Sequence, residues 1–110
     1  MYRTLRNPGT NRNGSRFDVG TITAVWQKAA VIRGNDPDNF RKDACGAWIR
    51  WSAYGNTGEY GWEIDHRKPV AAGGGDELTN LQPLHWRNNR EKGDLWPART
   101  ADYCAVTARS

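Results

Sequence analysis

The sequence predicts a small single domain of the α+β class, and three observations support that prediction. The chain has 110 residues, 37% of them hydrophobic, which is enough for one small core. Apolar residues recur at helical spacing over about 19–31, whereas residues 60–66 alternate as a half-buried strand does. A second helix is predicted over about 84–92, and the chain has no internal repeat, so these elements belong to one domain.

Composition excludes a membrane-spanning protein and one built on a disulfide framework or a four-cysteine zinc site. No stretch approaches the roughly 20 consecutive apolar residues that span a bilayer, and no apolar run follows the charged start, so we expect a cytoplasmic protein. Cys45 and Cys104 lack a CxxC companion, which excludes a disulfide framework and a four-cysteine zinc site, and we expect two free thiols. The six tryptophans are interpreted as core residues rather than base-stacking ones.

Residues 1–17 are expected to form a flexible basic arm. They hold arginines but no acid, and the rest of the segment is turn-forming and unable to bury a core. The net charge of +4 is too small to establish nucleic-acid binding by itself. DNA phosphates are the natural partner of Arg12 and Arg16, and a merely solvated segment is the alternative.

The domain is expected over residues 18–94, and it begins with the first helix. Asp18 is the N-cap candidate, because helical periodicity starts directly after it. Phe17 before the cap can pack against Ile22 as a hydrophobic staple. A strand over 47–54 follows, in a stretch that is rich in tryptophan.

Both histidines lie in one region, the first on a strand and the second on a helix. The strand over 60–66 ends in Asp65 and His66. Glu63, on the same face of that strand as Asp65, is interpreted as a salt-bridge partner rather than a metal ligand. A glycine-rich loop and a short extended piece then lead into the helix over about 84–92.

The helix places His85, Asn89 and Lys92 on one face. Asp65 and Asn89 carry hard oxygen ligands, which suit Mg²⁺ or Mn²⁺ more than Zn²⁺. A histidine is mostly unprotonated at neutral pH, so His66 can accept a proton from water. Several roles stay open for His85: a third metal ligand, a hydrogen bond that orients Asn89, a phosphate contact, or a structural role.

These residues resemble the ββα-metal motif, or His-Me finger, of the HNH endonuclease superfamily. That motif reads as an Asp-His pair, a glycine loop, an Asn-Leu pair and then Asn-x-x-Lys. The matching positions here are Asp65-His66, Gly73-Gly74, Asn80-Leu81 and Asn89 to Lys92. The resemblance implies a ββα-metal core over about 60–93, to which this chain adds an N-terminal helix, tryptophan-rich packing and a C-terminal tail over 95–110.

The resemblance also implies a role for each matching residue. Asp65 and Asn89 ligate one divalent cation, and His66 is the general base that activates water. Asn80 orients that histidine through its backbone or its side chain. Lys92 either contacts a phosphate or supports the fold.

The sequence departs from the family at the structural zinc site. Many members carry two CxxC pairs there, and the corresponding positions in this chain are Lys42, Cys45, His85 and Asn88. A tetrahedral zinc site needs four ligands, so we expect no structural zinc, and a zinc-stabilised interaction domain fails on ligand count. We expect tryptophan packing around Trp48, Trp62 and Trp86 to take the place of the metal.

The expected activity is hydrolysis of a DNA phosphodiester with one Mg²⁺ or Mn²⁺ ion, leaving a 5′-phosphate and a 3′-hydroxyl. A monomer with one site nicks one strand, whereas a double-strand break needs a dimer or two encounters. The expected contacts to the DNA backbone, which carry little sequence specificity, are Arg67, Lys68, Arg87, Arg90, Lys92, Arg12 and Arg16. The alternatives are a DNA-binding module without catalysis and a nuclease domain that requires a separate targeting chain.

Overall fold

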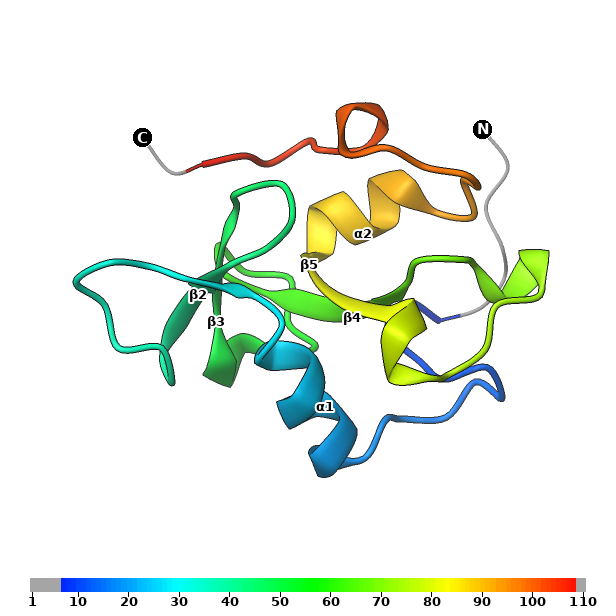
Figure 1. Ribbon diagram of the computed structural model, residues 1–110, viewed down its shortest axis with the longest axis horizontal. Helices are drawn as coiled ribbons and strands as arrows, with labels where there is room; N and C mark the ends of the chain where they lie inside the picture. Colours follow the sequence, from blue (N-terminus) through cyan, green and yellow to red (C-terminus); the bar gives the residue numbers. More distant parts are fainter. Residues whose placement is uncertain (1–6, 109–110) are drawn as a thin grey trace.

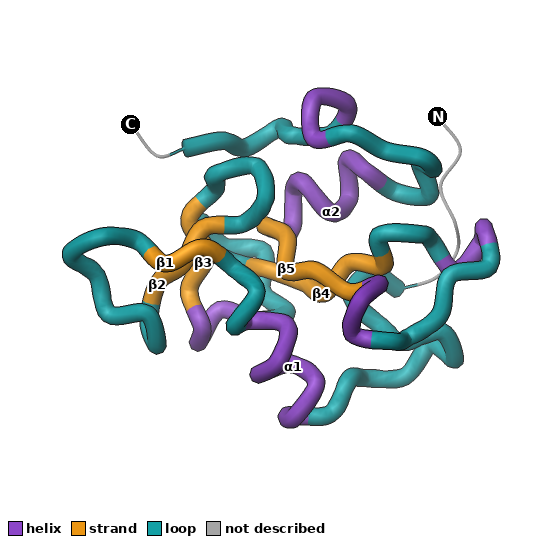
Figure 2. Tube along the Cα trace, viewed as in Figure 1, coloured by secondary structure: helices purple, strands orange, loops and turns teal. Residues whose placement is uncertain are grey.

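Two helices and two small antiparallel sheets are the main elements of the computed structural model, which describes residues 7–108 (Figure 1). Loops and short 3₁₀ turns make up much of the remaining chain (Figure 2). The fold is therefore a small α+β domain, as predicted. No helix within residues 7–108 is long and apolar enough to cross a membrane.

Helix α1, Val19–Trp26, begins where the sequence predicts and ends earlier. The Asp18 carboxylate accepts a hydrogen bond of 2.7 Å from the Thr21 amide, which confirms Asp18 as the N-cap. The predicted helix to residue 31 is too long, because Ala30–Val31 forms strand β1 instead. Pairing with a neighbouring strand overrides the helical pattern at these two residues.

The first sheet has the strand order β1-β2-β3, with antiparallel pairing throughout. Strand β2 is Phe40–Lys42, and strand β3 is Trp48–Arg50. The strand predicted over 47–54 is thus confirmed only in its first part, since a 3₁₀ turn over Trp51–Ala53 follows β3.

The second sheet pairs β4, Trp62–His66, with β5, Leu81–His85, and all ten residues are buried. Helix α2, Trp86–Lys92, follows β5 directly and contacts both strands. It starts two residues later than predicted, because β5 extends to His85. Figure 1 shows α1 and α2 on opposite sides of this strand pair, which therefore forms the centre of the domain.

The core is built around Trp62, whose side chain is fully buried. Its ring lies 5.3 Å from that of Trp26 and 4.8 Å from that of Tyr54, measured between centroids. Aromatic pairs at such distances add to the stability that burial of their area provides. The interpretation of all six tryptophans as core residues is too broad, since Trp86 is only half-buried and Trp96 is 49% exposed.

Cys45 and Cys104 form a disulfide, so the expectation of two free thiols is wrong. The C-terminal segment returns alongside α2, as Figure 1 shows, and this brings the two residues to a Cα–Cα distance of 5.5 Å. The same segment is held by Asn88, whose side chain donates to the Val106 carbonyl and accepts from the Val106 amide, each at 2.8 Å. The tail therefore packs on the domain.

A buried carboxylate, Asp43, links the two segments where the sequence analysis expects tryptophan packing in place of a structural zinc site. Asp43 accepts hydrogen bonds of 2.9 Å from the amides of Cys45 and Ala47. It also accepts from the His85 amide at 2.9 Å and from the Asn88 side chain at 3.1 Å. Asp43 and the disulfide, rather than tryptophan packing alone, connect the elements at this position.

Candidate active site

One pocket brings together Asp65, His66 and Asn89, on which the predicted chemistry depends. Asp65 and His66 are the last two residues of β4, and Asn89 lies in the middle of α2. Residues 7–10 of the N-terminal segment also line this pocket. The fold thus juxtaposes residues that are 24 positions apart in the sequence.

Asp65 is 5% exposed and is held through both of its oxygens. Gln82, its register partner on β5, donates to Oδ2 at 2.9 Å, and Lys92 Nζ lies 3.2 Å from Oδ1. Burial raises the pKa of Asp65, while the Lys92 ammonium and the Gln82 amide favour its ionised form and partly oppose that effect. The carboxylate is thereby fixed in one orientation at the edge of the pocket.

Asn89 is oriented by a carboxylate on the neighbouring strand. Its amide nitrogen donates to Glu63 Oε1 at 2.8 Å, and Arg90 Nη2 lies 2.8 Å from the other oxygen of Glu63. Glu63 is therefore a salt-bridge partner, as interpreted from the sequence. With its nitrogen occupied, Asn89 has its carbonyl oxygen available for a ligand, since that atom makes no hydrogen bond within the described residues.

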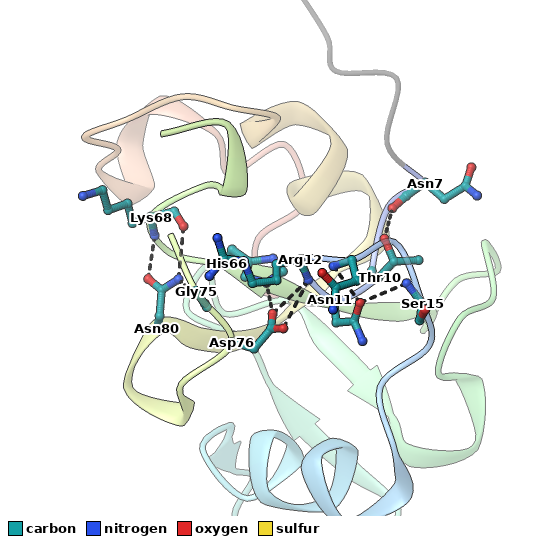
Figure 3. A network of polar contacts seen from close by, with 12 residues as sticks. Asn7, Thr10, Asn11, Arg12, Ser15, His66, Lys68, Gly75, Asp76 and Asn80 are labelled. Atoms are coloured by element: carbon teal, nitrogen blue, oxygen red, sulfur yellow. Dashed lines mark hydrogen bonds and ion pairs between the residues drawn. The ribbon is translucent and has the colours of Figure 1, made fainter. Parts of the chain in front are cut away.

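His66 is 9% exposed, and its ring is held by a carboxylate that the sequence analysis missed. Nε2 lies 2.7 Å from Asp76 Oδ1 (Figure 3). The centroid of the Phe17 ring lies 5.9 Å from that of the imidazole. The loop that leaves β4 after His66 returns at Leu81, the register partner of His66. Because the loop starts and ends at paired residues, an acidic residue within it can lie near the histidine. The position of Asp76 in this loop is the sequence signal that could have identified it.

Asn80 closes this loop and makes no hydrogen bond to the His66 ring. Its backbone carbonyl accepts from the Arg67 amide at 2.7 Å, and its side-chain oxygen accepts from the Lys68 amide at 2.8 Å. Its side-chain nitrogen donates to the carbonyls of Lys68 and Gly75 (Figure 3). Asn80 thus fixes the backbone that directly follows His66.

Residues 44–95 match the model of the HNH endonuclease family. The domain over residues 44–95 belongs to the HNH endonuclease family. Membership implies nuclease activity and DNA as the substrate. Neither the search of curated proteins nor the search of solved structures found a match. The matched range contains Asp65, His66, Asn80 and Asn89, and it leaves α1 and Cys104 outside.

The contacts of His85 support the structural role among those that the sequence left open. It is 3% exposed, and its Nδ1 accepts a hydrogen bond of 3.1 Å from the Arg87 amide at the start of α2. Because Nδ1 accepts, Nε2 carries the proton and donates to the Glu59 carbonyl at 2.8 Å. Both ring nitrogens are therefore committed within the protein.

Lys92 is 1% exposed, so the expectation that it contacts DNA is wrong. Its ammonium donates to the carbonyls of His66 and Arg67 at 3.0 and 3.2 Å as well as to Asp65. This lysine joins the end of α2 to the end of β4. Of the two roles considered for Lys92, its contacts therefore fit support of the fold.

The other predicted DNA contacts lie on the surface of the HNH domain or on the N-terminal segment. Arg67 and Lys68 are exposed and directly follow His66. The guanidinium groups of Arg87 and Arg90 lie over the Trp86 ring, at 5.5 and 5.3 Å from its centroid. Exposed residues also include Arg12 and Arg16.

The donor set of the pocket fits a hard divalent cation. It offers one carboxylate, from Asp65, and one amide oxygen, from Asn89, and oxygen donors of this kind suit Mg²⁺ or Mn²⁺. No group of three or more His, Cys, Asp and Glu side chains within residues 7–108 is placed to hold a metal. An ion in the pocket would therefore take two protein ligands and leave positions for water and a phosphate oxygen.

Proposed function

We propose that this HNH domain is a metal-dependent DNA endonuclease in which β4, β5 and α2 form the ββα-metal core. The observation that carries the proposal is the single pocket lined by Asp65, His66 and Asn89. A carboxylate and an amide oxygen can hold a divalent cation, and an imidazole can act as the general base in metal-assisted phosphodiester hydrolysis.

Each residue of the pocket has one task in this reaction. Asp65 and Asn89 would hold one Mg²⁺ or Mn²⁺, which when bound stabilises the negative charge that develops on the phosphate and on the departing 3′ oxygen. His66 accepts a proton from a water molecule whose oxygen attacks phosphorus in line with the P–O3′ bond. That bond breaks, the 3′ oxygen takes up a proton, and the products carry a 5′-phosphate and a 3′-hydroxyl.

The surface beside the pocket supports binding to the DNA backbone. Arg67 and Lys68 are exposed next to His66, where they can contact phosphates on either side of the cleaved bond. Such contacts position a duplex without reading its sequence, so we propose weak sequence specificity. One site per chain further supports nicking of a single strand by a monomer.

The cytoplasmic location expected from the sequence stays a prediction, and the disulfide bears on it. Cytosolic reductants keep most thiols reduced, so disulfides persist mainly in oxidising compartments. A thiol-alkylating reagent added directly to cells traps the redox state of Cys45 and Cys104. Reduced cysteines would support a cytoplasmic location, and a disulfide would support an oxidising compartment.

The activity is tested by incubating supercoiled plasmid with the pure protein in EDTA, Mg²⁺, Mn²⁺, Ca²⁺ or Zn²⁺, beside the His66→Ala variant. We expect conversion to open circles with Mg²⁺ or Mn²⁺, and a loss of at least about 100-fold in His66→Ala without loss of folding. A His66→Ala variant that retains most activity would exclude His66 as the base. A wild-type protein that binds plasmid and cleaves it with none of these ions would support the non-catalytic module or the need for a targeting chain.

A further inference from the structure

We propose that Asp76 is a positioning residue for His66, which sets both the orientation of the imidazole and the nitrogen that accepts the proton. The inference rests on the proposed nuclease function and extends it to a residue outside the matching motif positions. Asp76 Oδ1 lies 2.7 Å from His66 Nε2, and the two side chains are 34% and 9% exposed. The pair is thus partly shielded from water on the histidine side.

The chemistry of a carboxylate determines which tautomer this contact stabilises. An ionised carboxylate has only acceptors, so the ring nitrogen that faces it must carry the proton. In the neutral imidazole the lone pair is then on Nδ1. His66 Nδ1 makes no hydrogen bond within residues 7–108, and His66 lines the same pocket as Asp65 and Asn89. A carboxylate that orients a histidine in this way is a general device in hydrolases and metal sites.

Asp76 is itself fixed by the N-terminal segment. The Arg12 amide donates to both carboxylate oxygens, at 3.0 and 3.2 Å (Figure 3). Arg12 is the second residue of a turn that is closed by the hydrogen bond from the Gly14 amide to the Asn11 carbonyl, 2.8 Å long. The Asn11 side-chain oxygen accepts from the amides of Asn13 and Ser15 and stabilises the same turn.

The loop that carries Asp76 is fixed on its other side by Asn80. The Asn80 amide nitrogen donates to the Gly75 carbonyl at 2.9 Å, one residue before Asp76. Gly74 must be a glycine here, because a Cβ at this position would lie 1.7 Å from the Lys68 carbonyl oxygen. Two segments far apart in sequence, the turn at 11–14 and the loop at 67–80, therefore hold one carboxylate against the candidate base.

The direct test is the isosteric Asp76→Asn variant, with Glu77→Gln as the matched control. Glu77 is an exposed acid in the same loop, so both variants remove one negative charge at almost the same place. An asparagine can donate from its amide to Nε2, which permits the tautomer with the proton on Nδ1. We expect kcat for plasmid nicking to fall about 10- to 100-fold in Asp76→Asn, with KM nearly unchanged and Glu77→Gln close to wild type.

A second measurement tests the inference without any cleavage. Long-range ¹H–¹⁵N spectra of the imidazole at about pH 8, in protein without added metal, distinguish the protonated from the unprotonated ring nitrogen. We expect wild-type His66 to carry its proton on Nε2 and the Asp76→Asn variant to show both tautomers. Wild-type protein with the proton on Nδ1, or an Asp76→Asn variant with unchanged spectra and unchanged kcat, would overturn the inference. If the wild type fails to cleave DNA whichever metal ion is added, the proposed function fails. The spectra alone then decide whether Asp76 positions His66.

The support from the N-terminal segment is tested at Arg12 by two substitutions. Arg12→Pro removes the amide that binds Asp76, and the second position of a β-turn accommodates proline. Arg12→Ala keeps the amide and removes only the side chain, so it measures any contact of the guanidinium with DNA. Because Arg12→Pro loses the guanidinium as well, Arg12→Ala is the reference, and we expect kcat to be lower in Arg12→Pro than in Arg12→Ala by a factor smaller than the effect of Asp76→Asn. Equal kcat values for the two Arg12 variants would show that this amide does not support the base.

Discussion

Asn88 and Asn89 are neighbours on α2, yet they face two regions that use polar groups in opposite ways. Asn88 is fully buried, and its amide nitrogen and oxygen are bound by Asp43 and Val106. Asn89 binds Glu63 through its nitrogen and lines the pocket with His66. The first region satisfies its own polar groups and holds the fold together. The second leaves the Asn89 carbonyl oxygen and His66 Nδ1 without hydrogen bonds within residues 7–108.

The comparison shows why similar residues in this motif have different functions. His85 and His66 are both buried, but both ring nitrogens of His85 are bound within the protein, whereas only Nε2 of His66 is bound there. A buried polar group is a candidate for chemistry only where one of its atoms remains available in a pocket.

The largest expected effect separates the two asparagines. Asn89→Ala should lower kcat/KM for plasmid nicking by at least about 100-fold, because it removes one of the two proposed protein ligands for the metal. Asn88→Ala should instead lower the free energy of unfolding by about 2–4 kcal/mol, because Asp43 and Val106 lose partners in a buried site. Urea titrations and nicking assays on both variants check this. Equal loss of activity in the two folded variants would contradict the division.

The next effect concerns the disulfide of the structural region. Cys45 and Cys104 are 59 residues apart, and opening a loop of this length should cost about 2–4 kcal/mol of unfolding free energy. Thermal unfolding with and without reductant measures this. The double variant Cys45→Ser/Cys104→Ser is the control, and its unfolding should not respond to reductant. We expect the reduced protein to keep full activity at a temperature where it stays folded, because the disulfide is not part of the pocket.

The smallest effect is a pH dependence at the pocket. Burial raises the pKa of Asp65 above its ordinary value of 3.8, so a proton competes with a metal ion for this carboxylate at higher pH than for an exposed aspartate. Mn²⁺ affinity should therefore fall as pH is lowered from 8 to 5.

The same raised pKa affects folding stability. Folding favours the protonated form of Asp65, so its contribution to stability is greatest at low pH and is lost as pH rises through the unfolded-state and then the folded-state pKa. Titration calorimetry and urea unfolding across this range check both signs, and Asp65→Asn should weaken both dependences. An Mn²⁺ affinity that is constant or rises on acidification would contradict the assignment of Asp65.

Local signals predicted the elements and residues that depend on neighbours in sequence. Asp18 caps α1 because its side chain reaches an amide three residues ahead, and the alternation over 60–66 placed Asp65 and His66 correctly at the end of β4. The motif also predicted Asn80 and Asn89 as site residues. The contacts of Asn80 could be assigned only once the loop conformation was known, because the partners of its side chain are backbone groups 5 and 12 residues away.

Features that depend on distant contacts could not be predicted in the same way. The disulfide requires the C-terminal segment to return along α2, and a pair of cysteines without close companions carries no local sign of that return. Lys92 looks solvent-exposed in a helical pattern, but α2 directs it at the carbonyls that end β4. Residues 7–17 look unable to fold by composition, yet Asp76 and Tyr54 give this segment hydrogen bonds within the chain.

The most direct test of the central claim is a Mn²⁺ titration of wild type, Asn89→Ala and His66→Ala, followed by calorimetry or electron paramagnetic resonance. The account predicts one Mn²⁺ ion per chain in wild type and in His66→Ala, because the base does not ligate the metal. It predicts binding at least about 10-fold weaker in Asn89→Ala. Binding that is unaffected by Asn89→Ala, or absent from the wild type, would contradict the claim that Asp65 and Asn89 hold the ion beside His66.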